Sequence, residues 1–370
     1  MKRILFLFGT RPEAIKMAPL INHFSWDNRF IVKVGITAQH REMLDQVISF
    51  FEIPVDYDLN IMSHNQTLHQ LTSDLISRIT DEILLKEHFD YIFVQGDTTT
   101  VLAGALAAFY QKIKIIHIEA GLRSHNLKSP FPEEMNRLLT SKIADFHFCP
   151  TEISKQNLEN ENIHNNLYVV GNTVIDALFL GIEKIKSRHE SSLLEKFDFV
   201  DFNKKIILVT CHRRENFGAP FEEICDALLE IADQHKEVEI VYPVHLNPNI
   251  KETAYSKLQR KNIKLTYPME YPELIWMLNK SYIIITDSGG IQEEAPSLGK
   301  PVLVLRKETE RMEGIDAGNA ILVGHDKESI IKNCNELLHG NEKYAQMVGT
   351  KNPYGDGHAS ERIKEILLQQ

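Results

Sequence analysis

Acidic side chains follow several of the apolar, β-branched runs in this chain, and they are its best candidates for proton transfer. Asp97 comes just after the run Tyr91–Val94, and Glu119 comes directly after Ile113–Ile118. A carboxylate at the end of a buried strand is costly when it is unpaired, so we expect Glu119 to be functional. Asp97 could instead cap a helix that begins near Thr98.

A third acid and a histidine complete this set of reactive groups. The turn Pro130-Phe131-Pro132-Glu133-Glu134 starts a helix, and either glutamate could be reactive or an ordinary acid of a first helical turn. In the second half of the chain, His212 and His245 each follow an apolar run closely. Three acids and a histidine, if they lie near phosphate-binding loops, would suit proton transfer beside a leaving diphosphate.

The segment Asp287-Ser288-Gly289-Gly290 has the character of a phosphate-binding turn because it joins an apolar run to a helix start. Glycines there let backbone N–H groups approach an oxyanion, and the helix start adds partial positive charge. The alternative is a glycine-rich turn in which Ser288 only caps the helix. Glu293 and Glu294 favour the helix dipole, and one of them could accept hydrogen bonds from ribose hydroxyls.

Two cations at the first predicted helix make a second anion site. Arg11 follows the run Ile4–Phe8, Pro12 suits the first helical position, and Lys16 comes about one turn later. Arginine binds phosphate as a planar fork and lysine as a point charge. Surface salt bridges are the alternative role for both residues.

Alternating strands and helices are expected to position these groups. The first half contains five apolar runs typical of short buried strands: Ile4–Phe8, Val32–Ile36, Tyr91–Val94, Ile113–Ile118 and Phe146–Phe148. Three segments between them have apolar residues near a helical period: Arg41–Phe51, Leu68–Lys86 and Thr99–Tyr110. This order predicts a parallel α/β sheet whose strand ends line a ligand crevice.

The same order restarts after about residue 170. Strands are expected at Ile206–Thr210, Glu239–Val244, Lys264–Leu265, Tyr282–Thr286 and Val302–Leu305, with helices at Phe221–His235 and Ile291–Ser297. The segment Gly171–Lys204 holds a charged helix and is the best candidate for a linker. We therefore predict two α/β domains, residues 1–172 and 173–355, with a C-terminal helix at about 356–370 that packs back on the first.

Composition excludes several other classes of protein. The chain has 370 residues and a formal net charge of −10, so a nucleic-acid partner is not expected. No apolar stretch is long enough for a membrane span or a secretory leader, and the four scattered cysteines favour a cytoplasmic setting. The G-x-G-x-x-G and P-loop fingerprints, HExxH and clustered Cys/His ligands are absent from the sequence, so neither a nicotinamide cofactor nor a metal is expected.

Taken together, the motifs resemble those of the bacterial non-hydrolysing UDP-N-acetylglucosamine 2-epimerases over residues 4 to about 366. The resemblance rests on GTRPEAIKMAPL, TAQHREMLDQV, QGDTTT, HIEAGLRS, SPFPEEMNR, HRRENFG, VYPVHLNPN, the DSGGIQEEAPSLGKPVLVLR run and NPYGDG. It implies two Rossmann-like domains in a glycosyltransferase-B arrangement, an active site in the interdomain cleft, a homodimer and no cofactor.

The resemblance also implies a reaction. UDP-N-acetylglucosamine (UDP-GlcNAc) loses UDP and the C2 hydrogen to give a 2-acetamidoglucal, and re-addition gives UDP-N-acetylmannosamine (UDP-ManNAc) for bacterial surface polysaccharide. By motif match the acid–base and leaving-group residues are Asp97, Glu119, Glu133 and His212. The matching nucleotide and diphosphate positions are Arg11, Lys16, Ser288, Gly289, Gly290, Glu294 and Arg311.

Some positions depart from the family pattern. Glu310-Arg311-Met312-Glu313 replaces the usual ERPE, and Met269 and Leu274 stand where relatives often carry a glutamine and a phenylalanine near the uracil. Relatives can bind a second UDP-GlcNAc as an activator. The residues that would border such a site are Gln39, Glu42, Arg213 and His245, although Asn65 replaces an arginine seen in some relatives.

Other activities remain as alternatives. A hydrolysing epimerase would release N-acetylmannosamine and UDP, but such enzymes tend to lack the continuation Pro12–Lys16. Relatives that act on a diacetamido uronic acid usually depart from the same motif. A UDP-sugar-dependent glycosyltransferase would need an acceptor site that no motif marks, and a non-catalytic nucleotide-sugar sensor would not need three acids and a histidine at strand ends.

Overall fold

The computed structural model describes residues 1–38, 41–61 and 66–370. The chain divides into two compact units, one formed by Met1–Ala177 with Gly355–Gln370 and the other by Leu178–Tyr354. The division falls inside helix α7 (Thr173–Arg188), and α8 (Glu190–Lys196) follows it. The segment expected to be a linker is therefore largely helical.

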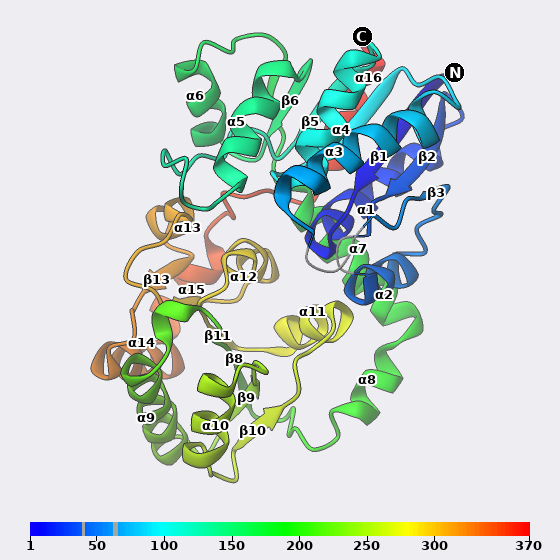
Figure 1. The fold of residues 1–370 in the computed structure, drawn as a ribbon. Coiled ribbons are helices and arrows are strands. Elements are labelled where there is room, and N and C mark those ends of the chain that lie inside the picture. The colour runs from blue at the N-terminus through cyan, green and yellow to red at the C-terminus, as the bar shows by residue number, and fades with distance from the viewer. Residues whose placement is uncertain (39–40, 62–65) are drawn as a thin grey trace. The chain divides into compact units, whose positions relative to one another are not determined.

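The first unit is built on a seven-stranded parallel sheet with the order β3-β2-β1-β4-β5-β6-β7 (Figure 1). Its strands are β1 (Lys2–Phe8), β2 (Phe30–Ile36), β3 (Tyr57–Asp58), β4 (Tyr91–Gln95), β5 (Lys114–Ile118), β6 (Phe146–Cys149) and β7 (Leu167–Val169). Its helices are α1 (Arg11–Ser25), α2 (Arg41–Phe51), α3 (Leu68–Ile79), α4 (Thr99–Tyr110), α5 (Glu133–Ile143), α6 (Glu152–Asn160) and α16 (Ala359–Leu368).

Successive side chains of β1 point to opposite faces of the first sheet, and helices pack on both faces. Leu5 and Leu7 belong to the apolar cluster that includes α3 and α4. Phe6 instead contacts Phe24 of α1, with ring centroids 5.9 Å apart, and the ring of Phe93 in β4 at 4.5 Å. Helix α16 packs against α1, so the C-terminal segment belongs to the first unit.

The second unit is built on a six-stranded parallel sheet with the order β10-β9-β8-β11-β12-β13 (Figure 1). Its strands are β8 (Lys205–Thr210), β9 (Val238–Pro243), β10 (Ile263–Thr266), β11 (Ile283–Thr286), β12 (Val302–Val304) and β13 (Ala320–Leu322). Its further helices are α9 (Ala219–Gln234), α10 (Pro248–Lys257), α11 (Tyr271–Lys280), α12 (Gly289–Glu294), α13 (Met312–Ala317), α14 (Lys327–His339) and α15 (Asn341–Gly349).

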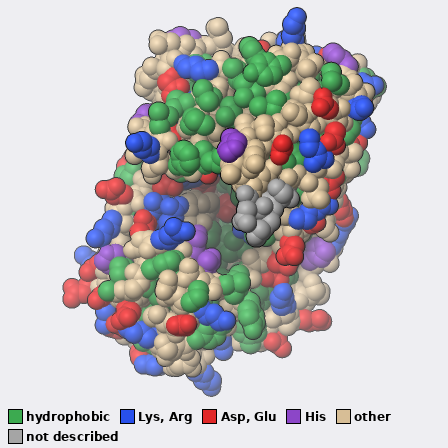
Figure 2. Space-filling view, viewed as in Figure 1, with side chains coloured by type: hydrophobic (Ala, Val, Ile, Leu, Met, Phe, Trp, Pro, Cys, Tyr) green, Lys and Arg blue, Asp and Glu red, His purple; other side chains and the backbone are tan. Residues whose placement is uncertain are grey.

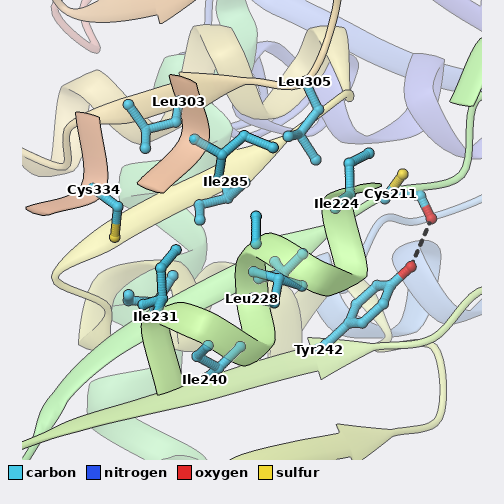
Figure 3. Packing of buried hydrophobic residues seen from close by; sticks show 14 of the residues in the cluster. Cys211, Ile224, Leu228, Ile231, Ile240, Tyr242, Ile285, Leu303, Leu305 and Cys334 are labelled. Carbon is cyan, nitrogen blue, oxygen red and sulfur yellow. Dashed lines mark hydrogen bonds between the residues drawn. The ribbon is translucent and has the colours of Figure 1, made fainter. Parts of the chain in front are cut away.

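The main apolar core of the second unit lies between its sheet and helices α9 and α14. Figure 3 shows Leu228 and Ile231 of α9 packed beside Ile285 of β11, and Cys334 of α14 joins the same cluster. At the edge of this core, the Tyr242 hydroxyl donates a hydrogen bond of 3.2 Å to the main-chain oxygen of Cys211. The core therefore reaches the loop that carries His212.

The predicted class of two Rossmann-like α/β domains is confirmed. The ten predicted strands occur with small shifts at their ends, whereas β3, β7 and β13, which have two or three residues each, were not predicted. The helix expected over Leu68–Lys86 changes to a π-helical turn at Thr80–Leu84, and the one expected over Ile291–Ser297 becomes α12 followed by a 3-10 turn at Ala295–Leu298. The predicted location of the active site between the domains stays a prediction.

Candidate functional site

The candidate residues gather where the strand order of each sheet reverses. In the first sheet the reversal lies between β1 and β4, which are followed by the loops that carry Arg11 and Asp97. In the second it lies between β8 and β11, which are followed by His212 and Asp287. Such switch points are the usual ligand crevices of open α/β sheets.

Glu119 lies at the end of β5 and has a left-handed backbone, with φ of 62°. Its side chain is 6% exposed. One carboxylate oxygen, Oε1, accepts from Lys16 Nζ at 2.5 Å and from Asn172 Nδ2 at 2.9 Å, and the Gln95 amide donates to Oε2. This backbone conformation is uncommon for a residue other than glycine and often marks a functional position.

Lys16 is therefore an ion-pair partner of Glu119 as well as a candidate phosphate ligand. Arg11 is half-buried at the first position of α1, and its guanidinium makes no hydrogen bond or ion pair within the described ranges. Of the two predicted cations, Arg11 has the side chain that is available for an anion, while Lys16 compensates a buried carboxylate.

Asp97 lies in the loop after β4, and its Oδ2 accepts from Arg137 at 2.6 Å. Burial raises the pKa of Asp97, and the charges of Glu119 and Glu133 add to this effect while Arg137 and Lys16 oppose it. The alternative role of a helix cap is not seen, because Thr98 caps α4 with its own hydroxyl. A raised pKa in a group of acids is typical of a carboxyl that exchanges protons.

The two glutamates at the start of α5 have different surroundings. Glu134 is buried and accepts hydrogen bonds of 3.0 Å from the backbone amides of Ser124 and His125, so it holds the loop before α5. Glu133 is half-buried, and its charge raises the pKa of Asp97. Of the pair that the sequence left open, Glu133 is the one that belongs electrostatically to the group of acids.

Glu13 is a residue that the sequence-based search missed. It is buried in α1, where Oε2 accepts from the amides of Gly9 and Thr10, and Oε1 accepts from the Thr98 hydroxyl at 2.8 Å. Burial raises its pKa, although these hydrogen bonds partly offset the effect. Glu13 thus links the loop of Arg11 to the loop of Asp97, and the capping-box spacing from Thr10 to Glu13 was the signal that could have found it.

His117 in β5 is a second missed residue. Its Nε2 donates to the main-chain oxygen of Gly96 at 2.8 Å, next to Asp97. Burial lowers the pKa of His117 to about 3, so the ring stays neutral at physiological pH. Arg123, from the same sequence motif, is paired with Glu161 and has a buried side chain, so its role is structural.

In the second unit, Asp287 organises the loop that carries His212. Its Oδ2 accepts from the amides of His212 and Arg213 at 2.9 and 2.8 Å and from Asn216 Nδ2 at 3.0 Å. His212 Nδ1 lies 3.1 Å from Oδ1. Burial alone would raise the pKa of Asp287, but the His212 ring and these amides outweigh it and lower the pKa to about 2.

His245 and Arg213, which the sequence placed beside a second nucleotide site, lie close to His212. The rings of His212 and His245 stack with centroids 5.8 Å apart, and Arg213 Nε donates to the main-chain oxygen of Asp287 at 3.0 Å. Glu42 is exposed in the first turn of α2, and Gln39 and Asn65 lie outside the described residues. The structure thus brings two of the four candidates together.

The glycine-rich turn after β11 packs against Arg311. A Cβ on Gly289 would come within 3.2 Å of Arg311 Cζ, whereas the atom nearest to a Cβ on Gly290 is Glu294 Oε2 at 4.0 Å. Arg311 Nε donates to Glu293 at 2.9 Å, which assigns that acid a structural partner. Gly290 therefore keeps open space beside its backbone.

Four remaining candidate positions of the second unit can also be placed. Ser288 precedes α12, and its amide donates to the Thr286 hydroxyl at 3.0 Å. Glu294 is buried, and its charge adds to the effect of burial in raising the pKa of Tyr271. Met269 lines a cavity of about 350 Å³, and Leu274 is half-buried in α11.

The part of the chain that the structure describes contains no cluster of three or more metal-binding side chains. In the same ranges, no helix is both long and apolar enough to cross a membrane. The acids of the first unit are instead compensated by Lys16 and Arg137.

Comparisons with known proteins point to one enzyme family. The family model for UDP-N-acetylglucosamine 2-epimerase matches residues 22–368. The chain is 52% identical over 369 residues to a UDP-N-acetylglucosamine 2-epimerase of Escherichia coli K12, covering 99% of this chain and 98% of the relative. A crystal structure of the Neisseria meningitidis UDP-GlcNAc 2-epimerase bound to UDP-GlcNAc matches with 50% identity, a TM-score of 0.88 and full coverage of both chains.

A more distant structure matches over the same length. It is the Methanocaldococcus jannaschii UDP-GlcNAc 2-epimerase in complex with UDP-GlcNAc and UDP, with 36% identity, a TM-score of 0.78 and full coverage of both chains.

Proposed function

We propose that this chain, which belongs to the UDP-N-acetylglucosamine 2-epimerase family, interconverts UDP-GlcNAc and UDP-ManNAc without releasing free sugar. The observation that carries the proposal is the group of acids at the switch point of the first sheet. Asp97 has a raised pKa there because of burial and of its neighbours Glu119 and Glu133. An acid whose pKa is raised, with further carboxylates beside it, suits a reaction that removes a proton and returns it.

The proposed reaction is an elimination followed by a re-addition. A carboxylate of this group removes the hydrogen from C2 of the sugar, the C1–oxygen bond breaks, and its electron pair leaves on the β-phosphate of UDP. The remaining sugar is a 2-acetamidoglucal with a C1–C2 double bond. Return of UDP to C1 and of a proton to the opposite face of C2 gives the other epimer.

Each of the two switch points offers candidate ligands for a diphosphate. Arg11 contributes a guanidinium with no partner in the described ranges, and the open backbone at Gly290 leaves room for phosphate oxygens. We assign further nucleotide contacts to Lys16, Ser288, Gly289, Glu294 and Arg311, and His212 to the leaving β-phosphate. The reaction needs no cofactor in this scheme.

We further propose that the enzyme acts as a homodimer. Apolar side chains gather over α4 and α5 on the face shown in Figure 2. Met135 and Leu139 are exposed four residues apart on α5, and Phe131 is exposed just before it. Phe109 and Tyr110 are exposed at the end of α4, which contacts α5. A large apolar patch supports an interface with a second copy of this chain.

Two finer assignments complete the proposal. Binding of a second UDP-GlcNAc as an activator would use Arg213 and His245 beside His212. The product would supply ManNAc units for a bacterial surface polysaccharide, and the four buried, unbridged cysteines fit a reducing cytoplasmic compartment.

The test is conversion of UDP-GlcNAc in D₂O without added metal or nicotinamide. We expect a mixture with UDP-ManNAc in which both sugars carry deuterium at C2. Glu119→Gln should lower turnover on the order of a hundredfold or more, while the exposed control Glu195→Gln should match the wild type. Stoichiometric release of UDP and free N-acetylmannosamine would instead assign the hydrolysing reaction.

A further inference from the structure

The loop after β8 is held in place by one fully buried carboxylate. Asp287 is 0% exposed, and its Oδ2 accepts three hydrogen bonds, from the amides of His212 and Arg213 and from Asn216. A buried carboxylate on an otherwise apolar strand end needs such donors to stay charged. The contacts of Oδ2 alone would explain Asp287 as a structural residue.

The other oxygen of the same carboxylate is left to the His212 ring. His212 Nδ1 lies 3.1 Å from Oδ1, whereas the His212 side chain is 44% exposed. A carboxylate can only accept a hydrogen, so this contact favours the ring form that carries a hydrogen on Nδ1. The second ring nitrogen, Nε2, then points away from Asp287.

The surroundings of Asp287 leave few other charges to compete with His212. Cys211 and Tyr242 lie beside the carboxylate, and burial raises the pKa of both, so both are neutral. The Arg213 guanidinium approaches the main-chain oxygen of Asp287 through Nε. His245 stacks on His212 and accepts from the Asn247 amide through its own Nδ1.

We propose that Asp287 is a positioning residue for His212, which it holds in one orientation with a hydrogen on Nδ1, so that Nε2 can take up a proton and donate it as a hydrogen bond to the leaving β-phosphate. This inference rests on the proposed function and adds to it a residue that acts through another residue. The physical reason is that a buried carboxylate at Nδ1 fixes the ring and stabilises the positive charge that the ring carries while Nε2 holds a proton, so no rearrangement is needed when charge develops on the phosphate.

The test combines Asp287→Asn with His212→Gln. An amide at position 287 keeps the shape and one acceptor oxygen but can present an N–H to the ring, which reverses the preferred tautomer. We expect Asp287→Asn to lower kcat for epimerisation by about a hundredfold, with KM changed less. In the His212→Gln background the same change should cost less than about threefold, because residues that act as one unit are not additive.

A matched control is Asp326→Asn in the same unit. Asp326 caps α14 through a 2.7 Å hydrogen bond from the Ser329 amide, so its loss tests a structural aspartate outside the site. We expect near-normal turnover from this variant. Ring ¹⁵N NMR of the wild type, assigned by difference from His212→Gln, should show the hydrogen of His212 on Nδ1, and Asp287→Asn should move it to Nε2.

Equal losses from Asp287→Asn in the presence and absence of His212 would overturn the inference and leave Asp287 structural. An unchanged His212 tautomer in Asp287→Asn would also overturn it. Failure of the proposed function gives a different result, because a wild-type protein that does not exchange deuterium at C2 would still report the His212 tautomer by NMR.

Discussion

Acidification should destabilise the first unit through His117. The burial of this residue lowers its pKa to about 3, while the unfolded chain has a pKa near 6.5. Below pH 6.5, His117 therefore binds a proton in the unfolded state but not in the folded state. The stability that is present above pH 6.5 is lost as the pH falls toward 3. Linkage between these two pKa values gives a loss of about 2 kcal/mol from pH 7 to pH 5.

The assay is urea unfolding at pH 7 and at pH 5, read by a hydrogen-exchange pulse at one fixed pH with mass spectrometry of peptides. Peptides from β4 and β5 report the first unit, and those from β8 and β11 serve as an internal reference. His117→Gln should lose about 2 kcal/mol less than the wild type between the two pH values. His88→Gln, whose side chain is 81% exposed, should behave as the wild type. Equal losses in His117→Gln and wild type would refute the reasoning.

Three further outcomes follow from the packing. Gly121→Ala should prevent stable folding of the first unit, seen as a lost thermal transition, because its Cβ would lie 2.1 Å from the Ser154 oxygen at a φ of +88°. Glu13→Ala should cost about 1 to 3 kcal/mol for each of the two backbone amides left unpaired, measured by urea unfolding, and should slow epimerisation. Leu139→Glu should turn a dimer into a monomer by light scattering with the fold intact, and an unchanged mass would remove the α5 face from the proposed interface.

The regular elements could be predicted from sequence because each strand is a short apolar run that ends at a turn. β1 and β11 illustrate this, since each is apolar and is followed by glycine or by polar residues. The charged segment Gly171–Lys204 was predicted as a linker, and the division between the two units falls inside its helix α7. Strands such as β3 are too short for a period to be seen.

The positions of the candidate residues could also be predicted, but their partners could not. Lys16 and Glu119 are 103 residues apart in the chain, and His212 and Asp287 are 75 apart. Lys16 lies in the helix after β1, while Glu119, His212 and Asp287 follow β5, β8 and β11. Both contacts therefore depend on the strand order, which the sequence does not state. Lys16 at the start of α1 was predicted as a phosphate ligand, and its ion pair with Glu119 could not be seen in the sequence.

The strand order also explains why a role could be predicted for His212 but not for the Asp287 side chain. In the second sheet, β8 pairs directly with β11, although two other strands lie between them along the chain. The residues that follow β8 and β11 therefore become neighbours. An aspartate inside a glycine-rich turn is by itself an ordinary turn residue. It acquires a chemical role only when that register places its carboxylate 3.1 Å from a histidine ring. Wherever a parallel sheet reverses its order, the residue after each of the two central strands should therefore be considered together with the other.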